Sequence, residues 1–383
     1  MDIQTPLALL GGLSPQQFMR RHWQKKPLLV RAAVPHMVPP ISRAQLFDLA
    51  GQEGVESRLI RRIAAAPGWS LRHGPLGRRQ LPPVSQPGWT LLVQGVDLHD
   101  DGVHSLLRQF RFLPDARLDD LMISYASDQG GVGPHFDSYD VFLLQAAGRR
   151  RWSFGRQPGA RLREGLPLKI IEGFAPEQSF VLEAGDMLYL PPGYAHDGVA
   201  EGADCMTYSI GLRSPARAAL GADILARVAE AHAEELADGA GGADVHYRDP
   251  GQQAVASPGA IPPELQAFAQ EAVARALRDP RSVERALGEA MTEPKPNVWF
   301  DLETPVPETD WQHLALDRRT RMLYDARHVY INGESFRAGG RDATLMRRLA
   351  DRRELDARQL AAVSDEARDL LRDWCDAGWA HAR

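Results

Sequence analysis

Two histidines and one aspartate have the side-chain types and the spacing of ligands for one metal ion. His135 and Asp137 stand two residues apart, and His196 follows a predicted strand that ends at Leu190. In a β-strand, residues i and i+2 point to the same face, so these first two side chains can bind the same ion. Two histidines and one carboxylate form the facial triad of non-haem Fe(II) oxygenases, in which the other coordination positions stay open.

The His-x-Asp/Glu pattern is weak evidence by itself, because it occurs three times in this chain. The match at His232 and Glu234 falls in a predicted helix, where residues i and i+2 do not face each other. The match at His99 and Asp101 directly precedes a predicted helix, where an aspartate is typical of an N-cap. Only the match at His135 lies among predicted strands and is followed by a histidine after another strand.

A group of arginines suggests where a co-substrate would bind. Arg150 and Trp152 share one face of a predicted strand by alternation, and Arg149 and Arg151 are expected to point to solvent. An inward arginine needs a buried partner, and a dicarboxylate would supply one because a guanidinium matches a carboxylate with two hydrogen bonds. Ser124, on another predicted strand, could donate to the same carboxylate. The alternative, that all three arginines lie on a wet surface, stays open.

Short strands separated by Gly and Pro dominate the middle of the chain and predict an antiparallel sandwich or barrel. They are expected at residues 121–125, 139–146, 151–154, 178–182, 186–190 and 206–212. Upstream, helices are expected at residues 14–24, 42–51 and 103–113, with strands at residues 28–30 and 90–94.

After Pro215 the sequence becomes rich in Ala, Leu and Glu with helical periodicity, up to the pair Pro294 and Pro296, which is typical of a domain boundary. Beyond it, Asn332-Gly333 predicts a hairpin with a type I′ turn. Surrounding helices, one at residues 364–377, suggest a winged-helix-like module. The predicted domains are residues 1–213, 214–293 and 294–383.

The composition excludes several broad classes. The chain has 383 residues and a formal net charge of −5, which argues against a general binder of nucleic acids or membranes. Its two cysteines, Cys205 and Cys375, form no CxxC pair, so neither a disulfide framework nor a thiolate zinc site is expected. A reducing compartment fits this best, and we expect a cytoplasmic protein with no secretory signal and no membrane span.

The strings around these residues resemble the Jumonji C family of 2-oxoglutarate oxygenases. The resemblance rests on His135-Phe136-Asp137, on Gly148-Arg149-Arg150-Arg151-Trp152 and on the Pro-Pro-Gly run before His196. Many members carry Gly-x-Lys-x-Trp, so Arg150 stands where a co-substrate lysine usually stands. The resemblance implies an α+β fold: a double-stranded β-helix (cupin or jelly-roll) barrel, a helical dimerisation region and a small winged-helix-like C-terminal domain.

The same resemblance implies roles for individual residues. Fe(II) would be bound by His135, Asp137 and His196, and 2-oxoglutarate would chelate that iron and pair its far carboxylate with Arg150 and Ser124. O₂ would take the last position. Oxidative decarboxylation to succinate and CO₂ would then drive hydroxylation of a carbon of the substrate.

The resemblance is strongest to the bacterial ribosomal oxygenases within that family. It implies hydroxylation of an arginine side chain of the sixteenth large-subunit ribosomal protein by a homodimer. Candidates for contacts to an arginine substrate are Asp128, Tyr139 and Ser209, although Asp128 could instead cap a turn. Three alternatives stay open: a hydroxylase or demethylase of another protein side chain, a catalytically silent cupin scaffold in ribosome assembly, and a zinc or manganese cupin isomerase.

Overall fold

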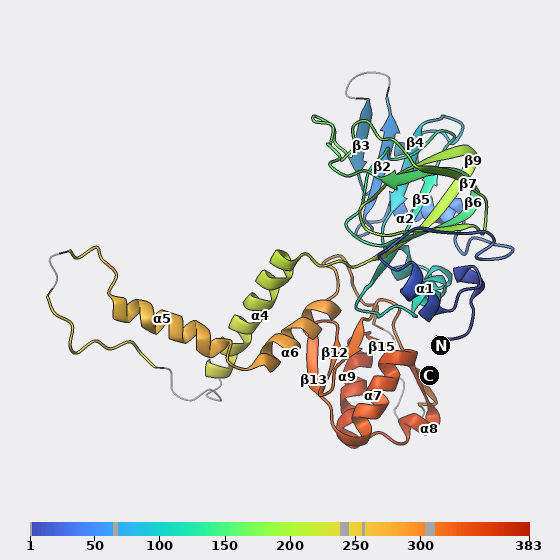
Figure 1. Ribbon diagram of the computed structural model, residues 1–383. Coiled ribbons are helices and arrows are strands. Elements are labelled where there is room, and N and C mark those ends of the chain that lie inside the picture. Colours follow the sequence, from blue (N-terminus) through green and yellow to red (C-terminus); the bar gives the residue numbers. More distant parts are fainter. Residues whose placement is uncertain (1, 64–67, 238–244, 255–256, 303–310) are drawn as a thin grey trace. The chain divides into compact units, whose positions relative to one another are not determined.

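The structure, a computed structural model, describes residues 2–63, 68–237, 245–254, 257–302 and 311–383. The chain divides into two compact units, Met1–Ser214 and Pro215–Arg383 (Figure 1). The first unit contains one large antiparallel sheet, and the second contains helices and two small sheets. The further division predicted between residues 293 and 294 stays a prediction.

Three helices of the first unit begin after side chains that cap their first turns. Ser14 and Ser42 each form a capping box with the glutamine three residues later, and Asp100 accepts a hydrogen bond from the Val103 amide. These helices are α1 (Pro15–Arg21), α2 (Arg43–Ala50) and α3 (Asp101–Leu107). They confirm the three predicted helices, although α1 and α3 end earlier than predicted.

The sheet of the first unit has the strand order β1-β8-β6-β9-β5-β4-β2-β3, with β7 also paired to β6, and every described pair is antiparallel. This confirms the predicted antiparallel class, but the sequence did not predict β2 and β3. The strands are β1 (Leu28–Val30), β2 (Ser57–Arg62), β3 (Trp69–His73), β4 (Trp89–Val93), β5 (Leu118–Ala126), β6 (Val141–Arg156), β7 (Gln178–Leu182), β8 (Met187–Leu190) and β9 (Tyr194–Leu212).

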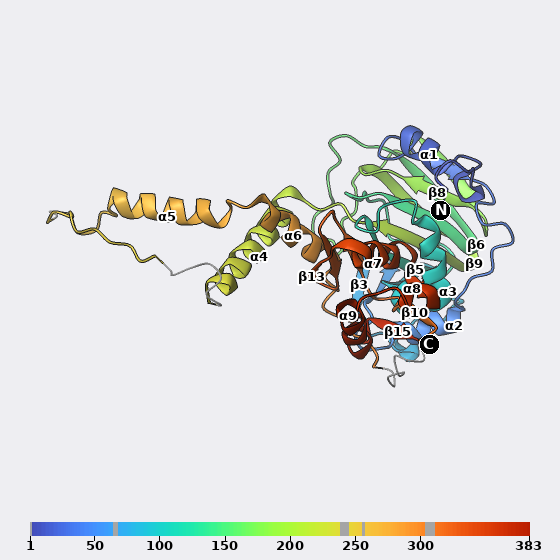
Figure 2. The same ribbon diagram turned by 90° about the horizontal axis from the view of Figure 1, so that it is seen from below.

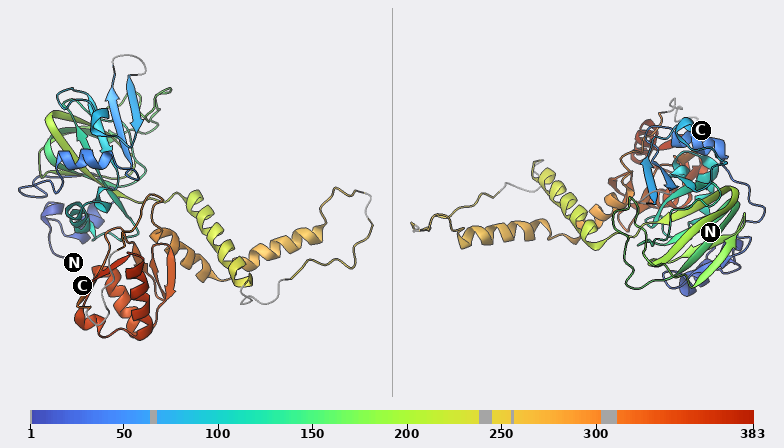
Figure 3. Two further views of the ribbon diagram at one scale, coloured as in Figure 1. Left: turned by 180° about the vertical axis from the view of Figure 1, so that it is seen from behind. Right: turned by 90° about the horizontal axis from the view of Figure 1, so that it is seen from above.

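The two longest strands, β6 and β9, run alongside each other over most of their length (Figure 2; green in Figure 3, right). The two strands predicted at residues 139–146 and 151–154 are therefore one strand with an irregularity inside it. The register with β9 shifts between Gln145 and Arg149, and Gly148 has a φ of +63°. Such a bulge shifts the alternation of side chains along the strand. The face of β6 that carries Val141 and Leu143 before the bulge therefore carries Arg150 and Trp152 after it.

Aromatic side chains fill the core between α1 and the sheet. The ring of Phe18 on α1 lies 5.6 Å from Phe142 of β6 and 4.9 Å from Tyr189 of β8, measured between centroids. Tyr189 also donates a hydrogen bond of 2.6 Å to Asp140, which is fully buried just before β6. Gln24 donates to the same carboxylate at 2.9 Å, so the loop that ends at Asp140 is tied to the core.

The second unit begins with α4 (Arg217–Ala237), α5 (Pro263–Ala276) and α6 (Pro280–Thr292). It continues with β10 (His313–Leu316), β11 (Met322–Tyr324), β12 (His328–Ile331), β13 (Glu334–Arg337), α7 (Gly340–Arg352), β14 (Glu354–Asp356), α8 (Ala357–Leu360), α9 (Asp365–Asp376) and β15 (Ala380–Ala382). The turn between β12 and β13 confirms the predicted hairpin, with φ of +47° at Asn332 and +93° at Gly333. Of the helices in the described ranges, none has the length and apolar character needed to cross a membrane.

Candidate active site

The structure brings the three predicted metal ligands together in the first unit. One ligand atom from each of His135, Asp137 and His196 lies within 4.8 Å of the others. Nε2 of His196 is 3.7 Å from Oδ2 of Asp137, and the two imidazole centroids are 4.3 Å apart. Across the described part of the chain, this is the one cluster of at least three His, Cys, Asp or Glu side chains close enough to share a metal ion.

The local backbone is not the regular strand whose alternation was used to argue that His135 and Asp137 share a face. His135 instead forms an isolated antiparallel bridge with His196, through amide-to-carbonyl hydrogen bonds of 3.0 and 2.8 Å. The bridge holds the two imidazoles side by side, and Asp137 follows in irregular backbone. Strand alternation therefore does not describe residues 135–137, although the side chains of His135 and Asp137 converge as expected.

Both imidazoles are oriented by carbonyl groups of the main chain. Nδ1 of His135 lies 2.9 Å from the carbonyl oxygen of Gly133, and Nδ1 of His196 lies 3.0 Å from that of Tyr194. An Nδ1–H that donates to a carbonyl leaves the lone pair of Nε2 free, which is the tautomer that a metal ligand needs. The fixed backbone thus presents two Nε2 atoms toward the carboxylate of Asp137.

Burial sets the protonation of the cluster. It lowers the pKa of His196 to about 3, with the neighbouring His135 acting in the same direction, so this imidazole is neutral near pH 7. Burial also raises the pKa of Asp137, against the opposing effects of His135 and the Tyr139 hydroxyl. A carboxylate that converges with two imidazoles, of which His196 is neutral, is a ligand set that a divalent metal ion takes.

The triad opens into a cavity of about 480 Å³. Cross-strand pairs such as Arg58 with Leu92 and Leu92 with Ser124 show that β2, β4 and β5 present one continuous face to it. The strands contribute Arg58, Ile60, Leu71, His73, Leu92, Asp120, Met122, Ser124, Val141, Leu143, Arg150, Trp152, His196, Ser209 and Gly211, and Gln94 follows β4 directly.

Arg150 is the group in this cavity that most clearly lacks a partner. Its side chain is 3% exposed, and its Nε and Nη2 atoms are buried without a hydrogen-bond acceptor. Nη1 lies 3.5 Å from the carbonyl oxygen of Gly198, and the guanidinium carbon is 5.6 Å from the centroid of Trp152. The flanking Arg149 and Arg151 are exposed, as predicted. Two unsatisfied donors on a buried cation fit a carboxylate ligand.

The other predicted binding residues divide into two groups. Ser124, Tyr139 and Ser209 line the cavity, and the Ser124 hydroxyl lies 3.5 Å from the carbonyl oxygen of Thr207. The structure does not bring Asp128 to the cavity wall. Its Oδ1 accepts a 2.8 Å hydrogen bond from the amide of Gly202, so it fastens a turn, as the alternative interpretation held.

Sequence reasoning missed an acidic residue of the cavity, Asp120. It is 3% exposed and lies on β5 with Met122 and Ser124, at alternating positions that share the cavity face. The signal was available, because counting back two and four residues from Ser124 reaches Met122 and Asp120.

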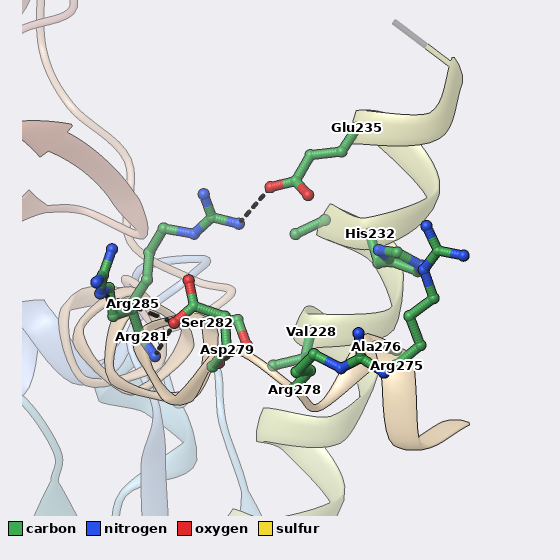
Figure 4. A pocket seen from close by; sticks show the side chains of 11 residues that line it. Val228, His232, Glu235, Arg275, Ala276, Arg278, Asp279, Arg281, Ser282 and Arg285 are labelled. Atoms are coloured by element: carbon green, nitrogen blue, oxygen red, sulfur yellow. Dashed lines mark hydrogen bonds and ion pairs between the residues drawn. The ribbon is translucent and has the colours of Figure 1, made fainter. Parts of the chain in front are cut away.

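A second cavity of about 480 Å³ lies among α4, α5 and α6 in the other unit (Figure 4). Its charged groups partly compensate one another, because Arg285 lies 3.7 Å from Glu235 and Arg281 lies 3.8 Å from Asp279. His232, which belongs to another His-x-Glu match of the sequence, lines this cavity without two further ligands beside it in the described residues.

Comparison with known proteins identifies the family. Residues 105–220 match the family model of the JmjC domain, and residues 275–381 match that of the ROXA-like winged helix. The ribosomal protein uL16 3-hydroxylase of Escherichia coli is 32% identical over 339 residues, which cover 85% of this chain and 86% of the relative. The chain belongs to the JmjC ribosomal oxygenase family. A probable ribosomal oxygenase of Haemophilus influenzae is 29% identical, with 96% of each chain covered.

Solved structures show the same fold over nearly the whole chain. The X-ray structure of E. coli YcfD is similar with a TM-score of 0.80 and 29% identity, covering 96% of this chain and 98% of YcfD. Another structure of YcfD, described as a ribosomal oxygenase in complex with cobalt and 2-oxoglutarate, has a TM-score of 0.77, 29% identity and coverage of 97% and 98%. These likenesses confirm the predicted cupin barrel and the winged-helix C-terminal module.

Membership of this family makes the chain a 2-oxoglutarate- and Fe(II)-dependent dioxygenase. The His-Asp-His cluster meets the metal requirement of that class, and the unsatisfied guanidinium of Arg150 meets its requirement for a cation that binds a dicarboxylate. Arg150 thus offers a buried guanidinium where many JmjC proteins carry a lysine.

Proposed function

We propose that this dioxygenase hydroxylates an arginine side chain of ribosomal protein uL16. The observation that carries the proposal is Asp120, a buried carboxylate that faces the cavity of the triad. A guanidinium is the cation that matches a carboxylate in shape, through two parallel hydrogen bonds. The E. coli relative, which covers 85% of this chain, is a uL16 3-hydroxylase and supports the choice of substrate protein.

In this proposal, His135, Asp137 and His196 would hold Fe(II), and the adjoining cavity leaves space for the co-substrate and the substrate. Arg150 and Ser124 bind the far carboxylate of 2-oxoglutarate. The bound iron, with 2-oxoglutarate and O₂, supplies the redox chemistry, which yields succinate, CO₂ and one hydroxylated carbon. The protein supplies the geometry, because four of the five side chains named here contact main-chain carbonyl groups.

The substrate side chain would enter between Asp120, Met122, Tyr139 and Ser209. Burial and the nearby Asp137 and Asp120 carboxylates raise the pKa of Tyr139, so its hydroxyl stays protonated and can donate hydrogen bonds. Met122 offers an apolar surface for the methylene stem of an arginine, whose guanidinium reaches the carboxylate.

The test is incubation of the purified protein with Fe(II), 2-oxoglutarate, O₂ and uL16, with the mass of uL16 mapped by fragmentation. We expect one added oxygen on an arginine, no addition with His135→Ala, and normal activity with the control His232→Ala, which alters the other His-x-Glu match. Turnover of 2-oxoglutarate without modified arginine would refute the substrate. Metal-bound protein with no turnover would instead favour a silent scaffold.

We also propose that the enzyme is a cytoplasmic homodimer that pairs through residues 214–293. Helix α5 has no buried residue, and it exposes Leu265 (38%) and Val273 (62%) on one of its faces. A ribosomal protein substrate places the activity in the cytoplasm. Light scattering on the full chain tests the dimer: Val273→Glu is expected to give a monomer, whereas Glu271→Gln on the same helix is expected to leave the mass unchanged.

A further inference from the structure

Gln94 connects an arginine and an aspartate of the active-site cavity. It follows β4 directly, and its Oε1 accepts a hydrogen bond of 3.3 Å from Nη2 of Arg58 on β2. Its Nε2 donates to both carboxylate oxygens of Asp120 on β5, at 3.0 and 2.9 Å. All three side chains line the cavity that contains the triad.

These contacts allow only one orientation of the amide group. If the amide were flipped, its oxygen would face the carboxylate of Asp120 and its NH₂ group would face the guanidinium of Arg58, and both contacts would be repulsive. The backbone of Gln94 is held as well, because its N–H donates to the carbonyl oxygen of Glu56 at 2.9 Å. Arg58 therefore acts on Asp120 through an amide that is fixed at both ends.

The amide orients the carboxylate and leaves its charge in place. A neutral donor that bonds to both oxygens fixes the plane and the rotation of the Asp120 carboxylate, without supplying a positive charge to compensate it. An ionised carboxylate has about four acceptor positions on its two oxygens, and the amide of Gln94 fixes the directions in which they point. An oriented carboxylate matters most to a planar guanidinium, because two parallel hydrogen bonds require both groups to lie in one plane.

We infer that Gln94, held by Arg58, is a positioning residue that sets the preference of this enzyme for a guanidinium over an ammonium. This inference rests on the proposed arginine substrate. Lysine carries a compact charge that needs no particular plane of the carboxylate. We call the hydrogen-bonded series Arg58–Gln94–Asp120 the relay. The relay selects the shape of the cation that binds, whereas the carboxylate of Asp120 alone requires the bound group to be positively charged.

The experiment compares Gln94→Met with the wild type on two uL16 peptides, one with the target arginine and one with lysine in its place. Met keeps the length of the side chain and removes both hydrogen bonds. We expect KM for the arginine peptide to rise about tenfold, equivalent to about 1.4 kcal/mol, and kcat to change less than threefold. KM for the lysine peptide is expected to change little, so discrimination between the peptides falls about tenfold. The matched control is Gln178→Met, an exposed glutamine of β7.

Two further variants keep the inference open to refutation if Gln94→Met folds poorly. Arg58→Met removes the outer support and is expected to shift the same ratio in the same direction. Gln94→Glu keeps the shape but places a second carboxylate against Asp120, and we expect a larger loss for the arginine peptide. Peptide binding without O₂ gives the same comparison as a Kd, independent of turnover.

The possible outcomes separate the two proposals. A wild type that modifies neither peptide would overturn the arginine substrate and the relay with it. The relay alone would be overturned if the wild type hydroxylates the arginine peptide but Gln94→Met loses the same activity on both peptides. Tighter binding of the arginine peptide by Gln94→Met would overturn it as well.

Discussion

Replacing Arg150 with methionine should stabilise the protein in the absence of 2-oxoglutarate and almost abolish binding of that co-substrate. The side chain is 3% exposed, with Nε and Nη2 buried and without acceptors. A buried polar group without a partner costs about 1–3 kcal/mol, and more when it is charged. The contact of Arg150 with the Trp152 ring, at 5.6 Å, recovers about 1 kcal/mol of that cost.

The net expectation is a gain of about 2 kcal/mol for Arg150→Met, which corresponds to a rise of roughly 4–8 °C in Tm for a unit of this size. The effect on the co-substrate has the opposite sign. Two hydrogen bonds between charged groups contribute roughly 3–5 kcal/mol, so KM for 2-oxoglutarate should rise at least a hundredfold. The assays are thermal unfolding with and without 2-oxoglutarate, and succinate production as a function of 2-oxoglutarate concentration.

The control is Arg149→Met, which removes the same charge from the adjacent exposed position. It should change neither Tm by more than a degree or two nor KM for 2-oxoglutarate. The opposite result would be a lower Tm for Arg150→Met than for the wild type, with KM for 2-oxoglutarate changed by only a few-fold. It would show that the guanidinium already has hydrogen-bond partners inside the protein. The assignment of Arg150 to the co-substrate would then be wrong.

Three further predictions test the surroundings of the site. Ser124→Ala removes one hydroxyl from the co-substrate end of the cavity and should raise KM for 2-oxoglutarate about fivefold, equivalent to about 1 kcal/mol, with little change in kcat. The amides of Ala32 and Glu183 and the guanidinium of Arg31 outweigh the effect of burial and lower the pKa of Asp186. The contribution of Asp186 to the free energy of unfolding is therefore complete above pH 4 and is lost as the pH falls through the lowered pKa. In urea unfolding, Asp186→Asn should therefore cost about 1–2 kcal/mol at pH 7, and this cost should decrease progressively as the pH falls below 4. Gly198→Ala would place a Cβ 2.6 Å from the ring of Trp152 and displace that ring. Circular dichroism should show the displaced tryptophan and lower stability, and enzyme kinetics should show weaker binding of 2-oxoglutarate.

The sequence predicted the strands whose apolar residues are continuous and missed those that carry charges. The run Val141–Leu144 is uniformly apolar and was readily identified as part of β6. Strand β2, Ser57–Arg62, was missed because it carries three arginines among its six residues, and only the cross-strand pairing with β3 and β4 gives it a buried face. Long-range pairing of this kind leaves no local signal in composition.

The site shows the same division between local and long-range information. His135, Asp137 and Arg150 were found by local spacing, which survives even where the backbone is irregular. Asp128 was named as an acidic candidate for substrate contact and Asp120 was not, yet Asp128 accepts a hydrogen bond from the amide of Gly202, 74 residues away in sequence. Position along the chain could not reveal that contact, whereas the alternation of β5 could have revealed Asp120.

One face of β5 links the two halves of the reaction. Ser124, Met122 and Asp120 line the cavity from this face, and Ser124 and Asp120 are about 13 Å apart along the strand at roughly 3.3 Å per residue. In the proposed reaction, the cation of Arg150 would attract a dicarboxylate to one end, and the anion of Asp120 would attract a guanidinium to the other. Opposite charges at the two ends therefore oppose exchange of the two ligands. Because the irregularity between Gln145 and Arg149, where the register with β9 shifts twice, turns Arg150 toward the cavity, the strand pairing gives the cavity this polarity.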